Sequence, residues 1–384
     1  MVKALVVAEF YPSQRDPVLG VWAHRQALAA RDAGAEIEVA VLHRLVPPRA
    51  ALRSRQALTE LARRVREPRV QERDGLRVTY VPFVSPPRDR AYARWGAWAA
   101  PPLAVALRAI RRRFPFDLVH AHNGVPTGDA VRRARPGVPI VLSVHGPDVL
   151  YVPERVPGGD AAVAAAFAAA RLTLANSQAI AALARRRGAP DVRVVHLGTD
   201  LPGETTKRRE TLVTVAHLIE RKRHADVIRA LWLLRDSHPR LRYVVIGDGP
   251  ERENLERLAN DLGVNVEFTG QLEHAEALAA ARRCSLFVMP SVDEAFGVAY
   301  IEAMAAGVPA IGARGEPGPE EIGDGLVLVP PGDPERLAAQ IAELIDEPRY
   351  LHDLGHQARD TVAREFTWER CGAATVAAYA DALR

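Results

Sequence analysis

The chain has 384 residues, of which 48% are hydrophobic and 26% are charged. This length exceeds one ordinary hydrophobic core and supplies enough apolar material for two, so we expect two domains. Cys284 and Cys371 lie far apart, and neither a disulfide framework nor a cysteine metal site is indicated. No long uncharged apolar stretch and no signal-peptide pattern occurs, so we expect a cytoplasmic protein, at most peripheral to the inner face of a membrane.

The net charge of +4 hides an asymmetry between the two halves. Residues 1–200 hold 30 lysines and arginines against 17 acids, a net +13, whereas residues 201–384 hold 21 against 30, a net −9. Most of the excess lies in residues 44–113, where 17 arginines and five acids accompany Phe83, Trp95 and Trp98. Basic and aromatic residues together suit contact with an anionic membrane or acceptor. An ordinary arginine-rich helical face explains them equally well, and both interpretations stay open.

Short β-branched runs alternate with helical stretches along the whole chain, which predicts parallel sheets built from strand–helix units and an α/β fold. The helix after the first strand should begin near Val21 and stop at Gly34, which suits the left-handed position beyond a helix end. The strands predicted in the first half are 4–8, 36–42, 78–81, 118–121, 140–144, 172–175 and 192–196.

Residues 198–210 have no apolar period and separate two alternating regions, so we interpret them as a hinge linker between domains 1–197 and 211–365. Residues 366–384 begin with a capping residue and continue as an Ala-rich helix, with Val376, Tyr379 and Leu383 on one side. We expect this helix to return to the first domain. The strands predicted in the second domain are 212–215, 243–246, 266–268, 286–289, 309–311 and 326–329.

The densest chemistry lies in Glu294-Ala-Phe-Gly-Val-Ala-Tyr-Ile-Glu302, directly after the strand predicted at 286–289. A helix that begins after Gly297 exposes amides that suit a diphosphate, and the carboxylates on either side can accept hydrogen bonds from sugar and ribose hydroxyls. Taken alone, however, two glutamates at this spacing fit better as a loop acid near a helix start and a solvent-facing helical glutamate.

The residues around the two glutamates favour the functional interpretation. From Pro290 to Pro309, the pattern Pro-Ser-x-x-Glu-x-Phe-Gly-x-x-x-x-Glu-Ala-Met-Ala-x-Gly-x-Pro resembles the Glu-x7-Glu motif of the retaining GT-B glycosyltransferases of family 4. The resemblance implies two Rossmann-like domains facing across a cleft, with the donor held chiefly on the second domain and the acceptor on the first. It also implies donor-binding roles for this motif: Glu294 at the sugar hydroxyls, the backbone amides of Phe296, Gly297 and Val298 at the sugar and phosphates, and Glu302 at the ribose.

Two further matches to the family lie in the first half. His145-Gly-Pro-Asp148 follows the predicted strand 140–144 at its carboxyl end, where open α/β sheets bind ligands. It is similar to a family His-Gly-x-Asp whose histidine lies beside the transferred sugar, and Asp148 is an acceptor-side candidate, although Asp after Pro also forms turns. Gly20 resembles the family glycine whose amide approaches the donor phosphate, with a plain turn glycine as the alternative.

Val215-Ala-His-Leu-Ile-Glu-Arg-Lys222-Arg resembles a family segment in which a strand ends in Gly-Arg and a lysine follows five residues after the arginine. Lys222 matches, but His217 stands where the arginine is expected, so half of the usual cationic clamp on the diphosphate is in doubt. Arg221 and Arg223 flank Lys222 and are candidate substitutes. A cation at a helix start opposes the helix dipole, which favours an anionic ligand here.

Gly247-Asp-Gly-Pro250 follows the predicted strand 243–246 and resembles the Gly-x-Gly-Pro turn that lies near the nucleotide in the family. It is not the dinucleotide fingerprint, because the third position is Arg252, so a nicotinamide enzyme is poorly supported. The sequence also has no Walker loop and no Asp-x-Asp for a divalent metal. We therefore expect no metal and no cofactor, with the phosphate charge met by protein groups.

These features together predict a metal-independent hexosyltransferase that moves a sugar from a nucleotide-diphosphate sugar, preferably a UDP-sugar, to a carbohydrate or lipid-linked acceptor. Retention is implied by the family, as is a role in cell-surface polysaccharide or glycolipid assembly. The catalytic candidates are His145, Lys222 and Glu294, the last for positioning. One alternative is a sugar-nucleotide epimerase of the same fold. A polyanion-binding module using the +13 half is another, but it leaves the glutamate motif idle, and we expect no nucleic acid as a partner.

Overall fold

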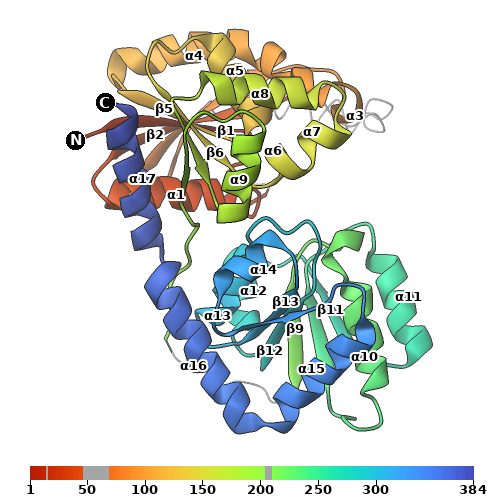
Figure 1. Ribbon diagram of the computed structural model, residues 1–384. Coiled ribbons are helices and arrows are strands. Elements are labelled where there is room, and N and C mark those ends of the chain that lie inside the picture. The colour runs from red at the N-terminus through yellow and green to blue at the C-terminus, as the bar shows by residue number, and fades with distance from the viewer. Residues whose placement is uncertain (14–15, 46–68, 204–209) are drawn as a thin grey trace. The chain divides into compact units, whose positions relative to one another are not determined.

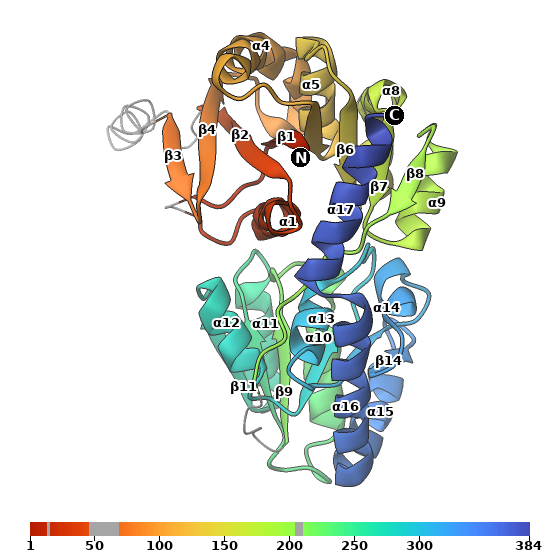
Figure 2. The same cartoon turned by 90° about the vertical axis from the view of Figure 1, so that its left-hand side faces the viewer.

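The computed structural model describes residues 1–13, 16–45, 69–203 and 210–384. The chain divides into two compact units (Figures 1 and 2). Unit 1 comprises Met1–His196 together with Glu369–Arg384, and unit 2 comprises Leu197–Trp368. The described part of the predicted linker is thus counted with unit 2. The arginines at positions 63, 64 and 66, which belong to the basic segment 44–113, lie outside the described residues.

Unit 1 contains a sheet with the strand order β3-β4-β2-β1-β5-β6-β7-β8 in its described part. All neighbouring strands pair in parallel except β3, which pairs antiparallel with β4. Each predicted strand of this half is present. β3 was not predicted, because Val-Gln-Glu-Arg is a short polar edge strand whose residues are half or fully exposed. The strands are β1 (Lys3–Ala8), β2 (Glu36–Arg44), β3 (Val70–Arg73), β4 (Leu76–Phe83), β5 (Leu118–His122), β6 (Ile140–Val144), β7 (Leu172–Ala175) and β8 (Val192–Val194).

The helices of unit 1 follow the strands in the α/β alternation that the sequence predicts. α1 starts one residue after Gly20, and Gly34 has a positive φ just beyond its end, as expected. The helices are α1 (Val21–Asp32), α3 (Arg88–Ala91), α4 (Trp95–Arg113), α5 (Asp129–Ala134), α6 (Pro147–Leu150), α7 (Val152–Arg155), α8 (Gly159–Ala169) and α9 (Gln178–Arg186), with a 3-10 turn at Tyr92–Arg94 and a π-turn at Gly124–Gly128.

The last helix, α17 (Trp368–Ala382), packs from Glu369 onward within unit 1. A Cβ on Gly372 would lie 2.1 Å from the carbonyl oxygen of Ala29, so α17 and α1 touch backbone to backbone. The predicted apolar face was partly wrong, because Leu383 is 41% exposed and lies past the end of the helix. The face that is buried consists of Cys371, Gly372, Thr375, Ala378, Tyr379 and Ala382.

Unit 2 contains a sheet with the order β11-β10-β9-β12-β13-β14, and every pair of neighbours is parallel. All six predicted strands are present. The core of the unit is built from apolar residues of these strands and of the helices that pack on them. The strands are β9 (Thr211–Val215), β10 (Arg242–Ile246), β11 (Val266–Gly270), β12 (Leu286–Met289), β13 (Ala310–Ala313) and β14 (Leu326–Val329).

The helices of unit 2 alternate with its strands, and two long helices follow the last strand. Helix α13 begins at Val298, immediately after Gly297, as the glutamate motif predicted. The helices are α10 (His224–Leu233), α11 (Arg252–Leu262), α12 (His274–Ala281), α13 (Val298–Met304), α14 (Pro317–Ile322), α15 (Pro334–Asp346) and α16 (Pro348–Glu365). Among the described residues, no helix is both long enough and apolar enough to cross a bilayer.

Candidate active site

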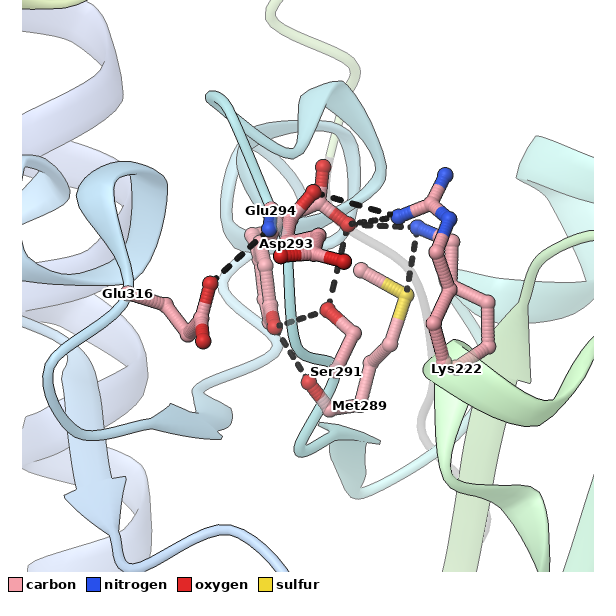
Figure 3. A network of polar contacts seen from close by, with 8 residues as sticks. Lys222, Met289, Ser291, Asp293, Glu294 and Glu316 are labelled. Carbon is pink, nitrogen blue, oxygen red and sulfur yellow. Dashed lines mark hydrogen bonds and ion pairs between the residues drawn. The ribbon is translucent and has the colours of Figure 1, made fainter. Parts of the chain in front are cut away.

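The centre of the site in unit 2 is an ion pair between Lys222 and Glu294. β9 and β12 are adjacent and parallel, with Leu212 opposite Leu286, so the segments that follow them start from the same edge of the sheet. Lys222 Nζ donates to Glu294 Oε2 at 2.5 Å, and Ser291 Oγ donates to the same oxygen at 3.1 Å (Figure 3). The side chains of Lys222 and Glu294 are only 12% and 11% exposed. Two of the three predicted catalytic residues therefore lie in contact.

The surroundings of Glu294 keep its carboxylate charged. Burial by itself would raise the pKa of Glu294, but the Lys222 ammonium, the Arg221 guanidinium and the Ser291 hydroxyl outweigh burial and lower the pKa below its usual value. Arg221 Nη1 lies 3.9 Å from Glu294 Oε2. A charged carboxylate accepts hydrogen bonds and cannot donate a proton, which agrees with the predicted positioning role rather than with general-acid chemistry.

One inference drawn from Lys222 is corrected by the structure. Lys222 was expected at a helix start, where its charge opposes the helix dipole and so favours an anionic ligand. It lies instead in the 3-10 turn Glu220–Lys222, before α10, and Glu294 supplies the balancing charge. The charge of Lys222 is therefore balanced within the protein, and a donor phosphate would have to share the lysine with Glu294.

Glu316 is a residue of this site that the sequence did not reveal. Its Oε2 accepts a hydrogen bond of 2.9 Å from the backbone N–H of Glu294 (Figure 3). The Glu294 carbonyl accepts a hydrogen bond of 3.0 Å from the Gly318 N–H. A Cβ on Gly318 would lie 2.2 Å from the Phe296 carbonyl oxygen, so only glycine permits this approach. The segment that begins α14 thus holds the loop 294–297 by its backbone. No spacing in the sequence signals such a contact.

Gly297 lies in the middle of the predicted donor motif, and Glu302 is its last residue. Gly297 has φ 82° and precedes α13, whose first amides lack partners inside the helix. Phe296 is buried, with its ring 5.6 Å from that of Phe366, so only its backbone is a candidate for donor contact. Glu302 lies on α13, 3.4 Å from His274 Nε2. The donor roles of these residues and of Val298 remain predictions.

His217 and Gly247 lie at neighbouring strand ends, as expected. His217 follows β9 and is exposed, so its side chain does not belong to the buried Lys222 pair. Gly247 has φ 140°, and a Cβ there would lie 2.0 Å from the carbonyl oxygen of Ala216. The backbone just after β9 therefore requires a glycine at position 247. The contact of Gly247 with the nucleotide remains a prediction.

In unit 1, His145 follows β6 and stacks on His122. The two rings are 5.2 Å apart and nearly parallel, and His145 Nε2 lies 3.0 Å from His122 Nδ1. Burial lowers the pKa of His145 to about 4. Its Nδ1 is buried and has no hydrogen-bond partner among the described residues. A neutral imidazole with one uncommitted nitrogen is thus held at the carboxyl edge of this sheet.

Two further buried groups, His120 and Tyr379, extend the cluster beyond His122. The sequence analysis did not identify either as a site residue. His120 Nδ1 lies 2.7 Å from the hydroxyl oxygen of Tyr379 on α17, and His120 Nε2 lies 2.7 Å from Ser143 Oγ. Burial lowers the pKa of His120 to about 3. His120 and His122 are two residues apart on β5, so their side chains lie on the same face of the strand. This spacing was the sequence signal that could have identified His120 and His122 as a pair.

Asp148 holds the two loops that carry these histidines. Its Oδ1 accepts a hydrogen bond of 2.6 Å from the Gly124 N–H, and its Oδ2 accepts bonds of 3.2 Å from Asn123 Nδ2 and from the His145 N–H. Burial raises its pKa, and these hydrogen bonds oppose that effect. The structure therefore makes Asp148 a positioning residue for His145, while a contact with acceptor remains a prediction.

Glu9 and Gly20 lie between β1 and α1, Glu9 directly after the strand and Gly20 directly before the helix. Glu9 follows β1, accepts a hydrogen bond of 2.9 Å from the Tyr92 hydroxyl, and has its pKa raised to about 7 by burial. The sequence analysis did not single it out. Gly20 has φ 74°, and a Cβ there would lie 2.2 Å from the carbonyl carbon of Phe10, so the protein itself requires this glycine. The presence of glycine at position 20 is therefore explained without the predicted contact with a donor phosphate.

The comparison with known proteins agrees with this architecture. Residues 18–202 match the family described as Glycosyltransferase Family 4, and residues 202–361 match Glycosyl transferases group 1. The D-inositol 3-phosphate glycosyltransferase 1 of Catenulispora acidiphila is 32% identical over 82% of this chain and 83% of its own length. The GDP-mannose-dependent monoacylated alpha-(1-6)-phosphatidylinositol monomannoside mannosyltransferase of Corynebacterium glutamicum is 31% identical, over 41% of this chain and only 43% of its own length.

A solved structure extends the likeness to the whole fold. The structure of Anabaena HepE in complex with UDP-glucose superposes with a TM-score of 0.72, covering 99% of this chain and 100% of that one at 19% identity. Two α/β units of this topology, with polar groups at the carboxyl ends of their strands, form the GT-B fold. The chain belongs to the group 1, family 4 glycosyltransferases and is a hexosyltransferase of that class.

The described residues contain no group of three or more histidine, cysteine, aspartate or glutamate side chains arranged to hold a metal ion. Metal independence stays a prediction, because the donor itself can supply ligands to a metal. The positive groups next to the donor motif are Lys222 and Arg221.

The buried imidazoles predict acid instability of unit 1. An unfolded histidine protonates near its ordinary pKa of 6.5, whereas folded His145 resists protonation until about pH 4. Stability is therefore retained above pH 6.5 and lost as the pH falls toward 4; His145 alone accounts for about 2 kcal/mol at pH 5. Calorimetry at pH 7 and pH 5 should show a smaller loss for His145→Asn than for the wild type. His352→Gln, at an exposed site on α16, is the control, and a loss that does not depend on His145 would contradict this origin.

Glu316 is expected to control donor binding through the loop 294–297. Glu316→Ala should raise the KM for the donor about tenfold, because one charged hydrogen bond to the loop is lost. Glu316→Gln keeps an acceptor oxygen and should largely restore KM. Glu320 lies in α14, which begins directly after Glu316, and accepts a hydrogen bond from the Gly315 N–H, so Glu320→Ala is the matched control. Equal effects of the two alanine variants, or no rescue by glutamine, would refute the positioning role.

Proposed function

We propose that this hexosyltransferase transfers a sugar, with retention of configuration and without a metal ion, from a nucleotide-diphosphate sugar to a carbohydrate or lipid-linked acceptor. The observation that supports this proposal most directly is the buried Lys222–Glu294 pair beside the first turn of α13. It brings a cation and a charged carboxylate to the place where a helix start favours phosphate. Retention follows the family resemblance.

The charges of the site fit the two ends of such a donor. Lys222 has three donor hydrogens and directs one at Glu294 and another at Met289 Sδ, 3.7 Å away, so one remains for a diphosphate oxygen. As the bond to the sugar breaks, negative charge grows on the leaving diphosphate, and Lys222, Arg221 and the amides after Gly297 stabilise it. Glu294 accepts hydrogen bonds from sugar hydroxyls and fixes their position. Glu302, on α13, is assigned to the ribose.

His145 is proposed to act on the reacting sugar as a neutral imidazole. Its low pKa means that it carries no charge at neutral pH, so it contributes a hydrogen bond rather than a cation. Two contacts fix the ring before substrate arrives: its stacking on His122, and the hydrogen bond from the backbone N–H of His145 to Asp148. Such preorganisation lowers the cost of reaching the transition state.

The base of the nucleotide and the acceptor are the finer parts of the proposal. The name of the Corynebacterium relative specifies GDP-mannose and a phosphatidylinositol mannoside, whereas HepE was solved with UDP-glucose. We propose a UDP-sugar, with GDP-mannose as the competing donor, and an acceptor in cell-surface polysaccharide or glycolipid assembly. A thermal-shift screen of nucleoside diphosphates decides between the bases, since a ligand at 100 times its Kd adds about 2.7 kcal/mol of stability. No shift with any of them would argue against the donor class.

Lys222→Ala is expected to abolish transfer and to weaken nucleoside diphosphate binding at least about tenfold, because a charged hydrogen bond contributes about 1.5–3 kcal/mol. The variant also leaves Glu294 buried without its partner, which lowers stability by itself. Lys222→Ala/Glu294→Gln removes the unpaired charge and should recover thermal stability but not binding, as titration calorimetry can measure. Recovery of binding together with stability would mean that Lys222 serves only the fold.

His217→Arg is expected to preserve or strengthen donor binding and to flatten its pH dependence between about pH 5.5 and 8. The reason is that histidine is positive only when protonated, whereas arginine stays charged, and His217 is the exposed group at the end of β9. Donor affinity measured across this range for the wild type and the variant gives the test, with His352→Arg as the surface control. Much weaker donor binding by His217→Arg would remove His217 from the phosphate clamp.

A further inference from the structure

The exposed side of α4 in unit 1 carries one continuous stripe of apolar and basic residues. The opposite side of the helix is buried through Trp95, Ala99, Leu103, Leu107 and Ile110. Trp98 and Val105 are 51% and 64% exposed, unusually high for side chains of this size and polarity. Because the exposed positions recur every three or four residues, they lie in one row along the helix. The row consists of Arg94, Trp98, Pro101, Val105, Arg108 and Arg112.

Positive charge dominates the neighbourhood of this stripe. α4 contains no acidic residue and ends in Arg111, Arg112 and Arg113. α5 lies beside α4 (Figures 1 and 2), and together they line a hollow of about 460 Å³. The hollow is lined by Ala97, Ala100, Pro101, Ala104, Arg132, Arg133 and Arg135.

Only part of the positive charge around the hollow is balanced inside the protein. The buried carboxylate of Asp129 lies 2.6 Å from Arg132 Nη2 and 2.8 Å from Arg133 Nε. One acid thus faces two arginines, and Arg135 has no ion pair among the described residues. An anion could therefore bind here without displacing an existing salt bridge. Arg132 and Arg133 lie on α5, and Arg135 follows directly after its last residue.

The combination of groups favours a lipid surface over other anionic partners. An indole beside arginines suits the boundary between headgroups and acyl chains, because its ring is apolar and its N–H is polar. Each arginine near an anionic bilayer adds electrostatic attraction to the lipid phosphates. A partner recognised by charge alone would gain nothing from Trp98 and Val105, which stand in the middle of the row.

We propose that this stripe, the exposed side of α4 with the arginines of α5, docks the enzyme on an anionic lipid bilayer. Trp98 and Val105 enter the interface, and the flanking arginines contact lipid phosphates. The proposal concerns a surface separate from the Lys222 site and does not depend on the donor assignment. Binding of this kind weakens as salt is raised, because the lipid charges are screened.

The test is sedimentation of the full-length protein with vesicles of phosphatidylcholine alone and with added phosphatidylglycerol. Wild-type protein should sediment with the anionic vesicles at low salt and less as salt increases. Trp98→Ala/Val105→Ser should weaken this binding about tenfold, since apolar area no longer leaves water. Trp232→Ala is the matched control, because Trp232 on α10 of unit 2 is also exposed and lies 4.4 Å from the Arg235 guanidinium.

Both substitutions in the stripe replace exposed side chains, so the variant should unfold at the same temperature as the wild type, which a melting curve verifies. The proposal is overturned if the wild type does not bind anionic vesicles at low salt, or if the double variant binds them as tightly as the wild type. Loss of vesicle binding in the presence of inorganic phosphate at constant ionic strength would identify an anion site instead of a bilayer surface. Arg108→Gln/Arg112→Gln should reduce both the binding and its dependence on salt.

Discussion

A lysine and a glutamate that are both nearly excluded from water depend on each other, and the sheet of unit 2 holds Lys222 and Glu294 together. Each charge alone would carry a desolvation cost of several kcal/mol in this position. The parallel order β10-β9-β12 makes the pair possible, because it places the carboxyl ends of β9 and β12 side by side. Ser291 and Glu316 then fix the carboxylate and its backbone. The loop that leads into α13 is thereby held before any donor binds.

This pairing changes how the phosphate of a donor would be bound. A free lysine would supply a whole positive charge, whereas a paired one supplies less, because Glu294 remains close. The remaining stabilisation has to come from Arg221 and from the fixed dipoles at the start of α13. Such groups are already oriented and need little reorganisation when charge develops, which is the condition under which electrostatic stabilisation is most effective. His217 is exposed and adds charge only when protonated.

Much of the fold could be predicted from local pattern, because buried parallel strands are β-branched runs that the sequence displays directly. β3 escaped prediction because an edge hairpin strand such as Val-Gln-Glu-Arg has no apolar run. Lys222 and Glu294 were found individually by motif, but their contact spans 72 positions and depends on strand order. Glu316 and Tyr379 were missed as site residues for a related reason: one binds a backbone amide and the other reaches a histidine from the far end of the chain. Leu383 was misplaced because helical periodicity does not reveal where a terminal helix stops.

The glycines show where sequence reasoning about ligands reaches its limit. Gly20 and Gly247 were interpreted as sites of close approach, and close approach does occur, but the approaching groups are the backbones of Phe10 and Ala216. A missing side chain therefore cannot by itself distinguish a phosphate from a neighbouring turn. A charged side chain distinguishes these cases better than a glycine does. A buried cation needs a negatively charged partner, and the structure shows which group that partner is. Of the predicted donor-site residues, Lys222 and Glu294 alone are both buried and tied to each other by charge in the described chain, and the assignment of the donor rests on them more than on any glycine.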